Sequence, residues 1–326
     1  MNIHPMWDQY PDMKKDLADV LTVIDESVTI RDAQARKIVL DLLHAGGKLL
    51  RPAFFLLTAK MGETYDRDQL IHVAASIEVL HMATLIHDDI IDEAETRRGL
   101  PTVQSQFGAK YALYTGDYLF CVCFKILSKY ATALSTVEFN TETVERVLIG
   151  ELEQMNSRYN TDMTVKQYLR QISRKTAALF AMSCHMGAEL SGAGKQAKIN
   201  ARKIGHEVGM AFQILDDILD FTQEANTLGK PVLEDMKQGV YSLPLIYAME
   251  RNRAAFLPLL EKKGDIQYED ADEVLALVKK YNGVEKAKEV ATKYTNKAVA
   301  RINKLPESES KKMMLALTEQ LLQRQS

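Results

Sequence analysis

Two clusters of aspartates have the residue types and spacing to bind divalent cations. Each follows the pattern Asp-Asp-x-x-Asp, at residues 88–92 (DDIID) and, 128 residues further on, at 216–220 (DDILD). On a helix, the first and fifth positions of this pattern lie one turn apart on the same face. Two carboxylates placed this way repel each other unless a cation lies between them. Hard oxygen ligands of this kind suit Mg²⁺, which completes its coordination with water and phosphate oxygens.

Both clusters close stretches that are apolar on almost every side. These stretches are 70–94 (LIHVAASIEVLHMATLIHDDIIDEA) and 204–221 (IGHEVGMAFQILDDILDF). A helix that is apolar all round lies in the middle of a bundle, where an unpaired carboxylate is costly. We therefore predict two central helices whose acidic ends face each other across a bundle cavity. One such cluster alone would be explained as well by a helix cap or a solvated helix face.

Basic and polar side chains occur where a bound anion would need them. They are Lys48 and Arg51, which would share one face of a helix start, then His81, Arg97 and Arg98 near the first cluster, and Lys175, Thr176, Gln213 and Lys230 around the second, with Gln213 pointing the same way as Asp216. Taken singly, each is more simply a salt-bridge partner or a satisfied polar residue. Together with the acids, they predict a site for a diphosphate ester, because Arg and Lys suit phosphate oxygens.

The composition favours an all-helical protein that does not depend on nucleic acid. The chain has 326 residues, with 41 Lys and Arg against 44 Asp and Glu, so the formal net charge is -3. With charges so balanced, the chain has no excess of positive charge that would attract nucleic acid. Only 16 glycines and 8 prolines interrupt long stretches of helical periodicity. We predict ten or more helices in a single domain over residues 1–326.

The cysteines and the apolar stretches favour a cytoplasmic protein without a membrane span. Cys121, Cys123 and Cys184 show no disulfide or zinc spacing, and we expect three buried thiols in a reducing compartment. Residues 1–19 do not resemble a signal peptide. The longest run without a charged residue covers 176–188, which is shorter than the roughly 18 residues that a span needs.

The order of the motifs resembles the all-trans polyprenyl diphosphate synthases, the polyprenyl synthetase family. The series is GGKLLRP, HMATLIHDDIIDEAETRRG, GDYLF, RKTAALF, GMAFQILDDILDF and LGKPVLEDMKQG…LP, and the similarity is strongest over residues 46–244. In detail, the chain is most similar to the large catalytic component of two-component hexaprenyl and heptaprenyl diphosphate synthases. The resemblance implies an all-α, isoprenoid synthase-type helical bundle with a central cavity.

The resemblance also implies a role for each motif residue. The residues that would hold up to three Mg²⁺ ions with the diphosphate are Asp88, Asp92, Asp216 and Asp220, supported by Asp89 and Asp217. The residues that would bind isopentenyl diphosphate are Lys48, Arg51, His81 and Arg98. Those on the allylic side are Arg97, Lys175, Thr176, Gln213 and Lys230. The residues expected to be catalytic are Asp88, Asp92, Asp216, Asp220 and Lys175.

The chain departs from the family pattern at two positions. The family often has Arg where Leu49 follows Gly-Gly-Lys, and often has Gly-Lys-x-Thr where this chain has GVYS at residues 239–242. One lysine that binds diphosphate is therefore missing. We therefore expect weaker binding of the allylic diphosphate but the same class of reaction.

The expected reaction is repeated Mg²⁺-dependent 1′-4 condensation of isopentenyl diphosphate with an allylic diphosphate, farnesyl diphosphate. The product would grow along the helix before Asp88, past a chain-length pocket formed by Ile77, Leu80, Ala83 and Thr84. The two positions nearest the metals, Ala83 and Thr84, are small. The helix from Ile77 to Asp88 is about 16 Å long. We predict a C30–C35 all-trans polyprenyl diphosphate, destined for a quinone side chain.

Three other functions and two assemblies remain open at this point. A class I terpene cyclase shares the first aspartate motif, although its second metal motif differs from DDILD. A non-catalytic helical subunit would have no need for intact acidic clusters, and a metal-dependent phosphohydrolase would release prenyl alcohol without extension. We expect a dimer, either of identical chains or with a small regulatory subunit.

Overall fold

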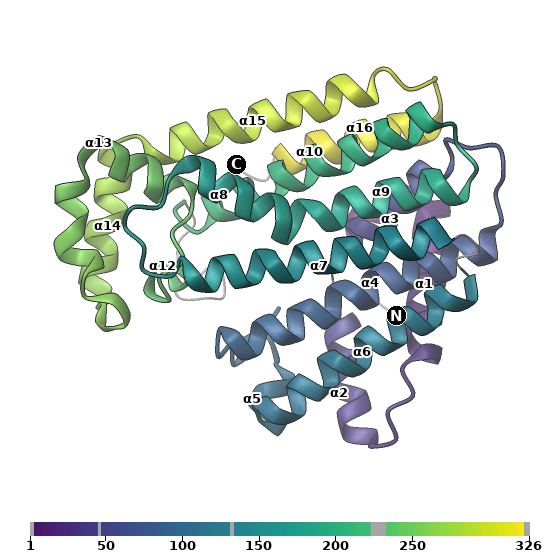
Figure 1. Ribbon diagram of the computed structural model, residues 1–326, viewed down its shortest axis with the longest axis horizontal. Helices are drawn as coiled ribbons and strands as arrows, with labels where there is room; N and C mark the ends of the chain where they lie inside the picture. The colour runs from purple at the N-terminus through teal and green to yellow at the C-terminus, as the bar shows by residue number, and fades with distance from the viewer. Residues whose placement is uncertain (1–2, 45–46, 131–133, 223–232, 323–326) are drawn as a thin grey trace. The chain divides into compact units, whose positions relative to one another are not determined.

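The computed structural model describes residues 3–44, 47–130, 134–222 and 233–322, and these residues are mostly helical (Figure 1). The elements in chain order are η1 (Pro5–Trp7), α1 (Pro11–Ser27), α2 (Ala33–His44), α3 (Leu50–Ala59), α4 (Arg67–Ile91), β1 (Thr96–Arg97), β2 (Leu100–Pro101), α5 (Val103–Phe107), α6 (Ala109–Tyr130), α7 (Leu134–Asn156), α8 (Val165–Ile172), η2 (Ser173–Ala177), α9 (Ala178–Leu190), α10 (Lys195–Leu219), α12 (Glu234–Lys237), α13 (Leu243–Leu260), η3 (Lys263–Asp265), α14 (Tyr268–Lys280), α15 (Gly283–Ile302) and α16 (Glu309–Leu322). The expectation of an all-α protein is confirmed.

The chain forms two compact units. The first unit comprises residues 1–141 and 182–201, and the second comprises residues 142–181 and 202–326. The division falls within the helices α7, α9 and α10, so neither unit is one continuous segment. A single domain over residues 1–326 stays a prediction.

Helix α4 is the core of the first unit and packs against α1, α3 and α6. Asp66 caps its N-terminus by accepting a hydrogen bond from the Gln69 N–H at 3.2 Å. Apolar side chains follow on almost every side, and Ile77 and Leu80 are each 1% exposed. Among the described helices, α4 alone is long and apolar enough to cross a membrane, but 72% of that window is buried in the fold. Its composition is therefore that of a core helix.

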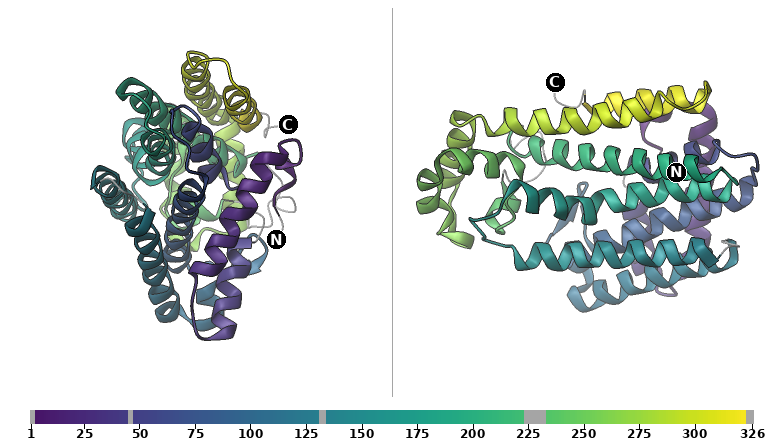
Figure 2. Two further views of the ribbon diagram at one scale, coloured as in Figure 1. Left: turned by 90° about the vertical axis from the view of Figure 1, so that its right-hand side faces the viewer. Right: turned by 45° about the horizontal axis from the view of Figure 1, so that its top comes forward.

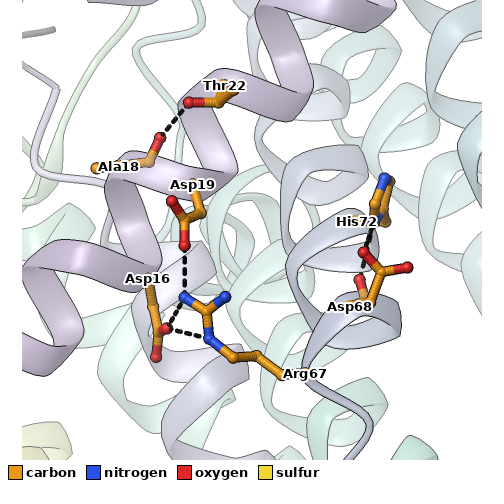
Figure 3. A network of polar contacts seen from close by, with 7 residues as sticks. All are labelled: Asp16, Ala18, Asp19, Thr22, Arg67, Asp68 and His72. Carbon is orange, nitrogen blue, oxygen red and sulfur yellow. Dashed lines mark hydrogen bonds and ion pairs between the residues drawn. The ribbon is translucent and has the colours of Figure 1, made fainter.

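An ionic network fixes the N-terminal end of α4 to α1 (Figure 3). Arg67 Nη2 lies 2.6 Å from Asp16 Oδ1 and 2.5 Å from Asp19 Oδ2. One turn further along α4, His72 Nδ1 lies 3.4 Å from Asp68 Oδ1. The Arg67 side chain is 45% exposed, so the network adds little to stability. It positions the N-terminal end of α4, which is the end away from the aspartates at residues 88–92.

A two-stranded hairpin follows α4. Thr96 pairs with Pro101 and Arg97 with Leu100 in the antiparallel strands β1 and β2. The two turn residues, Arg98 and Gly99, have φ values of 53° and 77°, as a two-residue type I′ turn requires. Strands of two residues are too short to show alternation, which is why the sequence pattern did not indicate them. The hairpin places Arg97 and Arg98 just beyond the first aspartates.

The three cysteines are free, but one of them is not buried. Cys123 and Cys184 are buried, and burial raises the pKa of the Cys123 thiol to about 12. Cys121 is exposed, so the prediction of three buried thiols was wrong at this position. The reason is helical geometry, because residues two apart on α6 point to different sides of the helix.

In the second unit, a π-helical turn joins α8 to α9. Thr164 and Gln167 form a capping box at the start of α8. The π turn η2 carries the sequence SRKTA, and such turns are frequent at functional sites. Helix α10 packs closely against this segment at Gly205, where a Cβ atom would lie 2.2 Å from the Phe180 carbonyl oxygen. Further along the chain, α13, α14 and α15 pack together (green to yellow in Figure 2).

Candidate active site

The first acidic site, formed by Asp88, Asp89 and Asp92, lies at the C-terminal end of α4. Asp92 is the C-cap residue, and its N–H donates to the Asp88 carbonyl oxygen at 2.8 Å. A helix carries partial negative charge at its C-terminus. Three carboxylates at this end add to that negative charge, so a cation bound here would be stabilised. The prediction that an apolar helix ends in these acids is confirmed.

The middle aspartate of this site is buried against an arginine. Asp89 is 1% exposed, and its Oδ1 lies 2.7 Å from both Nε and Nη2 of Arg97. Burial raises the pKa of Asp89, while the pairing with Arg97 pulls it back and the charges of Asp88 and Asp92 raise it further. Its other oxygen, Oδ2, is buried and has no hydrogen-bond partner among the described residues.

Beside the first acidic site lies a cationic cluster, which we define as Arg51, His81 and Arg98 with the buried acid Glu78. Burial lowers the pKa of Arg51 to about 10, an effect that Glu78 opposes and Arg98 reinforces. Burial also raises the pKa of Glu78, which is 4% exposed, and the two arginines pull it back down. Three of the four predicted ligands of isopentenyl diphosphate are thus electrostatically coupled within the first unit.

His81 is neutral at physiological pH in this environment. Its pKa lies well below 6.5 because of burial first, and then because of the charges of Arg51, Arg98 and Arg97. A neutral imidazole can donate one hydrogen bond to a phosphate oxygen but adds no charge.

Lys48, the fourth predicted ligand, lies in the loop before α3. The prediction that Lys48 and Arg51 share one helix face was wrong, because α3 begins at Leu50. Leu49 turns the chain with a φ of 49°. The Lys48 carbonyl oxygen accepts a hydrogen bond from Trp7 Nε1 at 2.9 Å.

The second acidic site comprises Asp216, Asp217 and Asp220 at the end of α10, in the second unit. Asp217 is 8% exposed. Tyr168 donates its hydroxyl to Oδ2 at 2.5 Å, and Gln213 donates Nε2 to Oδ1 at 2.8 Å. Burial raises the pKa of Asp217 well above its usual value, and these two hydrogen bonds only partly offset that effect.

The two outer acids of this site differ in exposure, and Gln213 bonds to the middle one. Asp216 is exposed and Asp220 is half-buried. Gln213 bonds to Asp217, four residues on, and its orientation toward Asp216 stays a prediction. Its Oε1 accepts from the Thr176 hydroxyl at 2.7 Å. The π turn therefore places Thr176 in the hydrogen-bond network of the second acidic site, as expected.

Of the two lysines predicted for the allylic side, Lys175 is described, and it bonds to side chains of α7. Lys175 Nζ lies 2.8 Å from Glu151 Oε2 and 2.8 Å from Gln154 Oε1, both on α7. Lys230 lies outside the described residues, as does Gly46 of the GGKLLRP motif. The roles of both lysines stay predictions.

The predicted chain-length residues lie along α4, before the first acidic site. Ile77 and Leu80 are 1% exposed and Ala83 is fully buried. Thr84 is half-buried, and its hydroxyl donates to the His81 carbonyl oxygen at 2.7 Å. The hydroxyl of Thr84 is thus satisfied within its own helix.

The donor set fits Mg²⁺ better than a closed metal site. Within the described residues, no three His, Cys, Asp or Glu side chains converge on one point. Mg²⁺ does not require such a cluster, because one or two carboxylates suffice when water and phosphate oxygens complete its shell. The buried Oδ2 of Asp89, without a partner among the described residues, is consistent with a nearby cation.

Sequence reasoning missed two residues of these sites. Glu78 is a lone acid in the apolar stretch before His81. An unpaired carboxylate is costly in such a stretch, and this argument, applied above to the aspartates, holds equally for Glu78. Tyr168 carries no comparable signal. It reaches Asp217 from 49 residues away in the sequence, so only the fold reveals the contact.

The comparisons with known proteins agree with one another. The family model of the polyprenyl synthetases matches residues 32–280. Heptaprenyl diphosphate synthase component 2 of Geobacillus stearothermophilus is 37% identical over 306 residues, which cover 94% of each chain. The crystal structure of geranylgeranyl pyrophosphate synthase from Lactobacillus brevis is similar at a TM-score of 0.94 and 41% identity, over 98% of this chain and 99% of that one. Heptaprenyl diphosphate synthase from Staphylococcus aureus is similar at a TM-score of 0.91 and 33% identity, over 96% and 99% of the chains.

The chain belongs to the polyprenyl synthetase family. It is accordingly a prenyltransferase, and its helices have the isoprenoid synthase fold of the solved members. The names of these relatives denote products of different length, so the family does not decide how far this enzyme extends its product.

Proposed function

We propose that the protein extends farnesyl diphosphate with isopentenyl diphosphate to a C30–C35 all-trans polyprenyl diphosphate. The observation that carries the proposal is the adjacency, within one unit, of a cationic cluster and an acidic helix end. Arg97 pairs with Asp89 of the acidic site, and it also lowers the pKa of His81 in the cationic cluster. Cations for one diphosphate thus lie next to acids for the metal that activates the other.

The acids of the two sites would hold Mg²⁺, on which the family generally depends. Asp88 and Asp92 are the proposed ligands in the first site, and Asp216 and Asp220 in the second. When bound, Mg²⁺ neutralises the charge that develops on the leaving diphosphate. The proposed ligands of the isopentenyl diphosphate are Lys48, Arg51, His81 and Arg98. Those of the allylic diphosphate are Arg97, Lys175, Thr176, Gln213 and Lys230.

The remaining work of the chain is to orient the substrates and exclude water. The apolar surface of α4 provides dry walls against which an allylic cation survives long enough to be attacked by the double bond. Among the described residues, none stands out as a base for the proton that then leaves. We propose that the departed diphosphate accepts this proton.

Product length is proposed to depend on the small residues of α4. Replacing Ala83 by Phe, or Thr84 by Tyr, adds an aromatic ring where the growing chain first passes. Both variants should release shorter products, measured by mass spectrometry of the extracted diphosphates. Asp68→Tyr, which adds a ring at the exposed start of α4, should leave the product length unchanged. Unchanged products in Ala83→Phe and Thr84→Tyr would contradict this part of the proposal.

Product analysis separates the proposed reaction from its rivals. The purified chain is incubated with Mg²⁺, farnesyl diphosphate and labelled isopentenyl diphosphate, and the products are identified by mass. Extended diphosphates support the proposal. A cyclic hydrocarbon would indicate a terpene cyclase, and farnesol with phosphate a phosphohydrolase. A protein that yields no product with or without a small subunit would be a non-catalytic subunit.

We further propose that the enzyme works as a dimer, either with itself or with a small regulatory subunit, in the cytoplasm. Helix α6 exposes Leu113, Tyr114 and Phe124, at 47%, 72% and 39%, and the three free cysteines suit a reducing compartment. A relative is named as component 2 of its enzyme. The mass of the purified chain in solution, and its activity alone and with a small subunit, test the assembly. Full activity of a monomer would contradict it. We propose that the polyprenyl product is then transferred to a quinone precursor, where it becomes the side chain.

A further inference from the structure

An N-terminal segment outside the family match contacts the loop that carries Lys48. The family model begins at residue 32, whereas Trp7 lies in η1 (Pro5–Trp7). Trp7 is fully buried and is the only tryptophan in the chain. Its indole Nε1–H donates to the Lys48 carbonyl oxygen at 2.9 Å, across 41 residues of sequence.

The loop held by this bond has a strained backbone. Leu49, next to Lys48, has a φ of 49° although it is not glycine. A left-handed residue with a side chain is unfavourable and persists only where the surroundings determine the conformation. The Leu49 side chain is buried at 5% exposure, and its carbonyl oxygen accepts the Ala53 N–H at 3.0 Å, which starts α3. The Trp7 bond restrains the residue immediately before this turn.

The same loop packs on its other side against the cationic cluster. A Cβ atom at Gly47 would lie 2.5 Å from Arg98 Nη1, so the guanidinium rests where a side chain would otherwise be. Arg51 follows in the first turn of α3, and the charge of Arg98 affects its pKa. A shift of the main chain at Lys48 would therefore move the Lys48 side chain. It would also move Gly47, against which the Arg98 guanidinium packs.

We propose that Trp7 is a positioning residue that holds the Gly47–Leu49 loop in the conformation that binds the diphosphate of isopentenyl diphosphate. The inference rests on the proposed function of this loop. It assigns a role in substrate binding to a segment that lies before the residues matched by the family model. The indole N–H, rather than the bulk of the ring, carries the role, since the ring alone would fill space without fixing the carbonyl group.

Trp7→Phe tests the role because it keeps a buried aromatic ring and removes the donor. By calorimetry with Mg²⁺, its affinity for isopentenyl diphosphate should fall about three- to tenfold, as expected for one lost hydrogen bond. Affinity for farnesyl thiodiphosphate, an unreactive allylic analogue, should stay within about twofold. In turnover assays, KM for isopentenyl diphosphate should rise while kcat stays nearly unchanged. Tyr10→Phe is the matched control, because Tyr10 contacts the Trp7 ring and should affect neither affinity.

Hydrogen exchange tests the restraint itself. The amides of residues 48–50 should exchange faster in Trp7→Phe than in Tyr10→Phe or the wild type. Unchanged exchange, or equal loss of affinity for both diphosphates, would overturn the inference. If the wild type bound no isopentenyl diphosphate, the proposed function of the loop would fail, and the exchange rates alone would decide whether Trp7 holds it.

A second substitution guards against misfolding of Trp7→Phe. Because the chain has one tryptophan, growth on benzothienylalanine replaces the indole N–H by sulfur at this position alone, with the ring size kept. The same weaker binding of isopentenyl diphosphate supports the inference. Wild-type affinity in this protein would overturn it.

Discussion

The two acidic sites share one five-residue pattern but differ in what surrounds the middle aspartate. In the first site, Asp89 forms an ion pair with Arg97 from the hairpin after α4. In the second, Asp217 accepts hydrogen bonds from two neutral donors, Tyr168 and Gln213. Both carboxyls are buried, and burial raises the pKa of each, but only that of Asp217 lies well above its usual value.

The difference shows that identical motifs can balance charge by different means. Arg97 supplies a permanent positive charge at the first site. The neutral donors of the second site stabilise a carboxylate less than a cation does. The charge of Asp235, contributed by α12, disfavours ionisation of Asp217 further. The second site should therefore depend more on bound cations for its charge balance than the first.

The largest expected effect concerns the outer acids, for which the two sites should behave alike. Asp88→Asn and Asp216→Asn each remove a proposed metal ligand. Each should lower kcat/KM by about 10²–10³-fold, because charge on the leaving diphosphate is then less stabilised. Steady-state assays over a range of Mg²⁺ concentrations measure this. Asp68→Asn, at the other end of α4, should stay within about twofold, and a similarly small effect of either ligand variant would remove that site from the metal chemistry.

The middle acids should differ in their contribution to stability. Asp89→Asn keeps the shape but removes the charge that pairs with Arg97, which should lower the free energy of unfolding by about 2 kcal/mol. Asp217→Asn also relieves the burial of a charge, so its cost should be about 1 kcal/mol or less. Chemical denaturation of both variants measures the difference. Equal losses would mean that Arg97 contributes no more than the neutral donors do.

The smallest effect concerns His81, beside the first site. Its pKa in the folded protein lies well below the value of 6.5 in the unfolded chain, so the unfolded state binds the proton first as the pH falls. The stability contributed by this histidine is complete above about pH 6.5 and is lost below it. Between pH 7 and pH 5.5, the wild type should lose about 1 kcal/mol more than His81→Gln. Parallel pH profiles of the two proteins would show that burial and the neighbouring arginines do not lower the pKa of His81.

Much of the fold and the acidic sites could be predicted because they depend on local pattern and strong physics. Few glycines and prolines, with helical periodicity, indicate helices regardless of their partners. Acids at the ends of apolar helices stand out because their burial is costly, and α4 and α10 each end at their acidic cluster. That the two ends face each other across a cavity stays a prediction. The electrostatic coupling of Arg51, His81 and Arg98 agrees with their expected grouping.

The remaining details depend on contacts that the pattern does not contain. Whether Gln213 meets Asp216 or Asp217 depends on a side-chain rotamer, since residues three and four apart are both neighbours on a helix. Lys48 lies outside α3 because of the turn at Leu49, to which a tryptophan 41 residues earlier contributes. Lys175 meets Glu151 on another helix. The positions of Lys48 and Lys175 thus depend on contacts between residues far apart in the sequence.

The most direct test of the account is the number of metal ions that each acidic site contributes. Native mass spectrometry of the protein with Mg²⁺ and farnesyl thiodiphosphate counts the ions bound together with the diphosphate. We expect up to three in the wild type, and fewer in both Asp88→Asn and Asp216→Asn. The same number of ions in all three proteins would contradict the claim that both acidic sites bind metal with an allylic diphosphate.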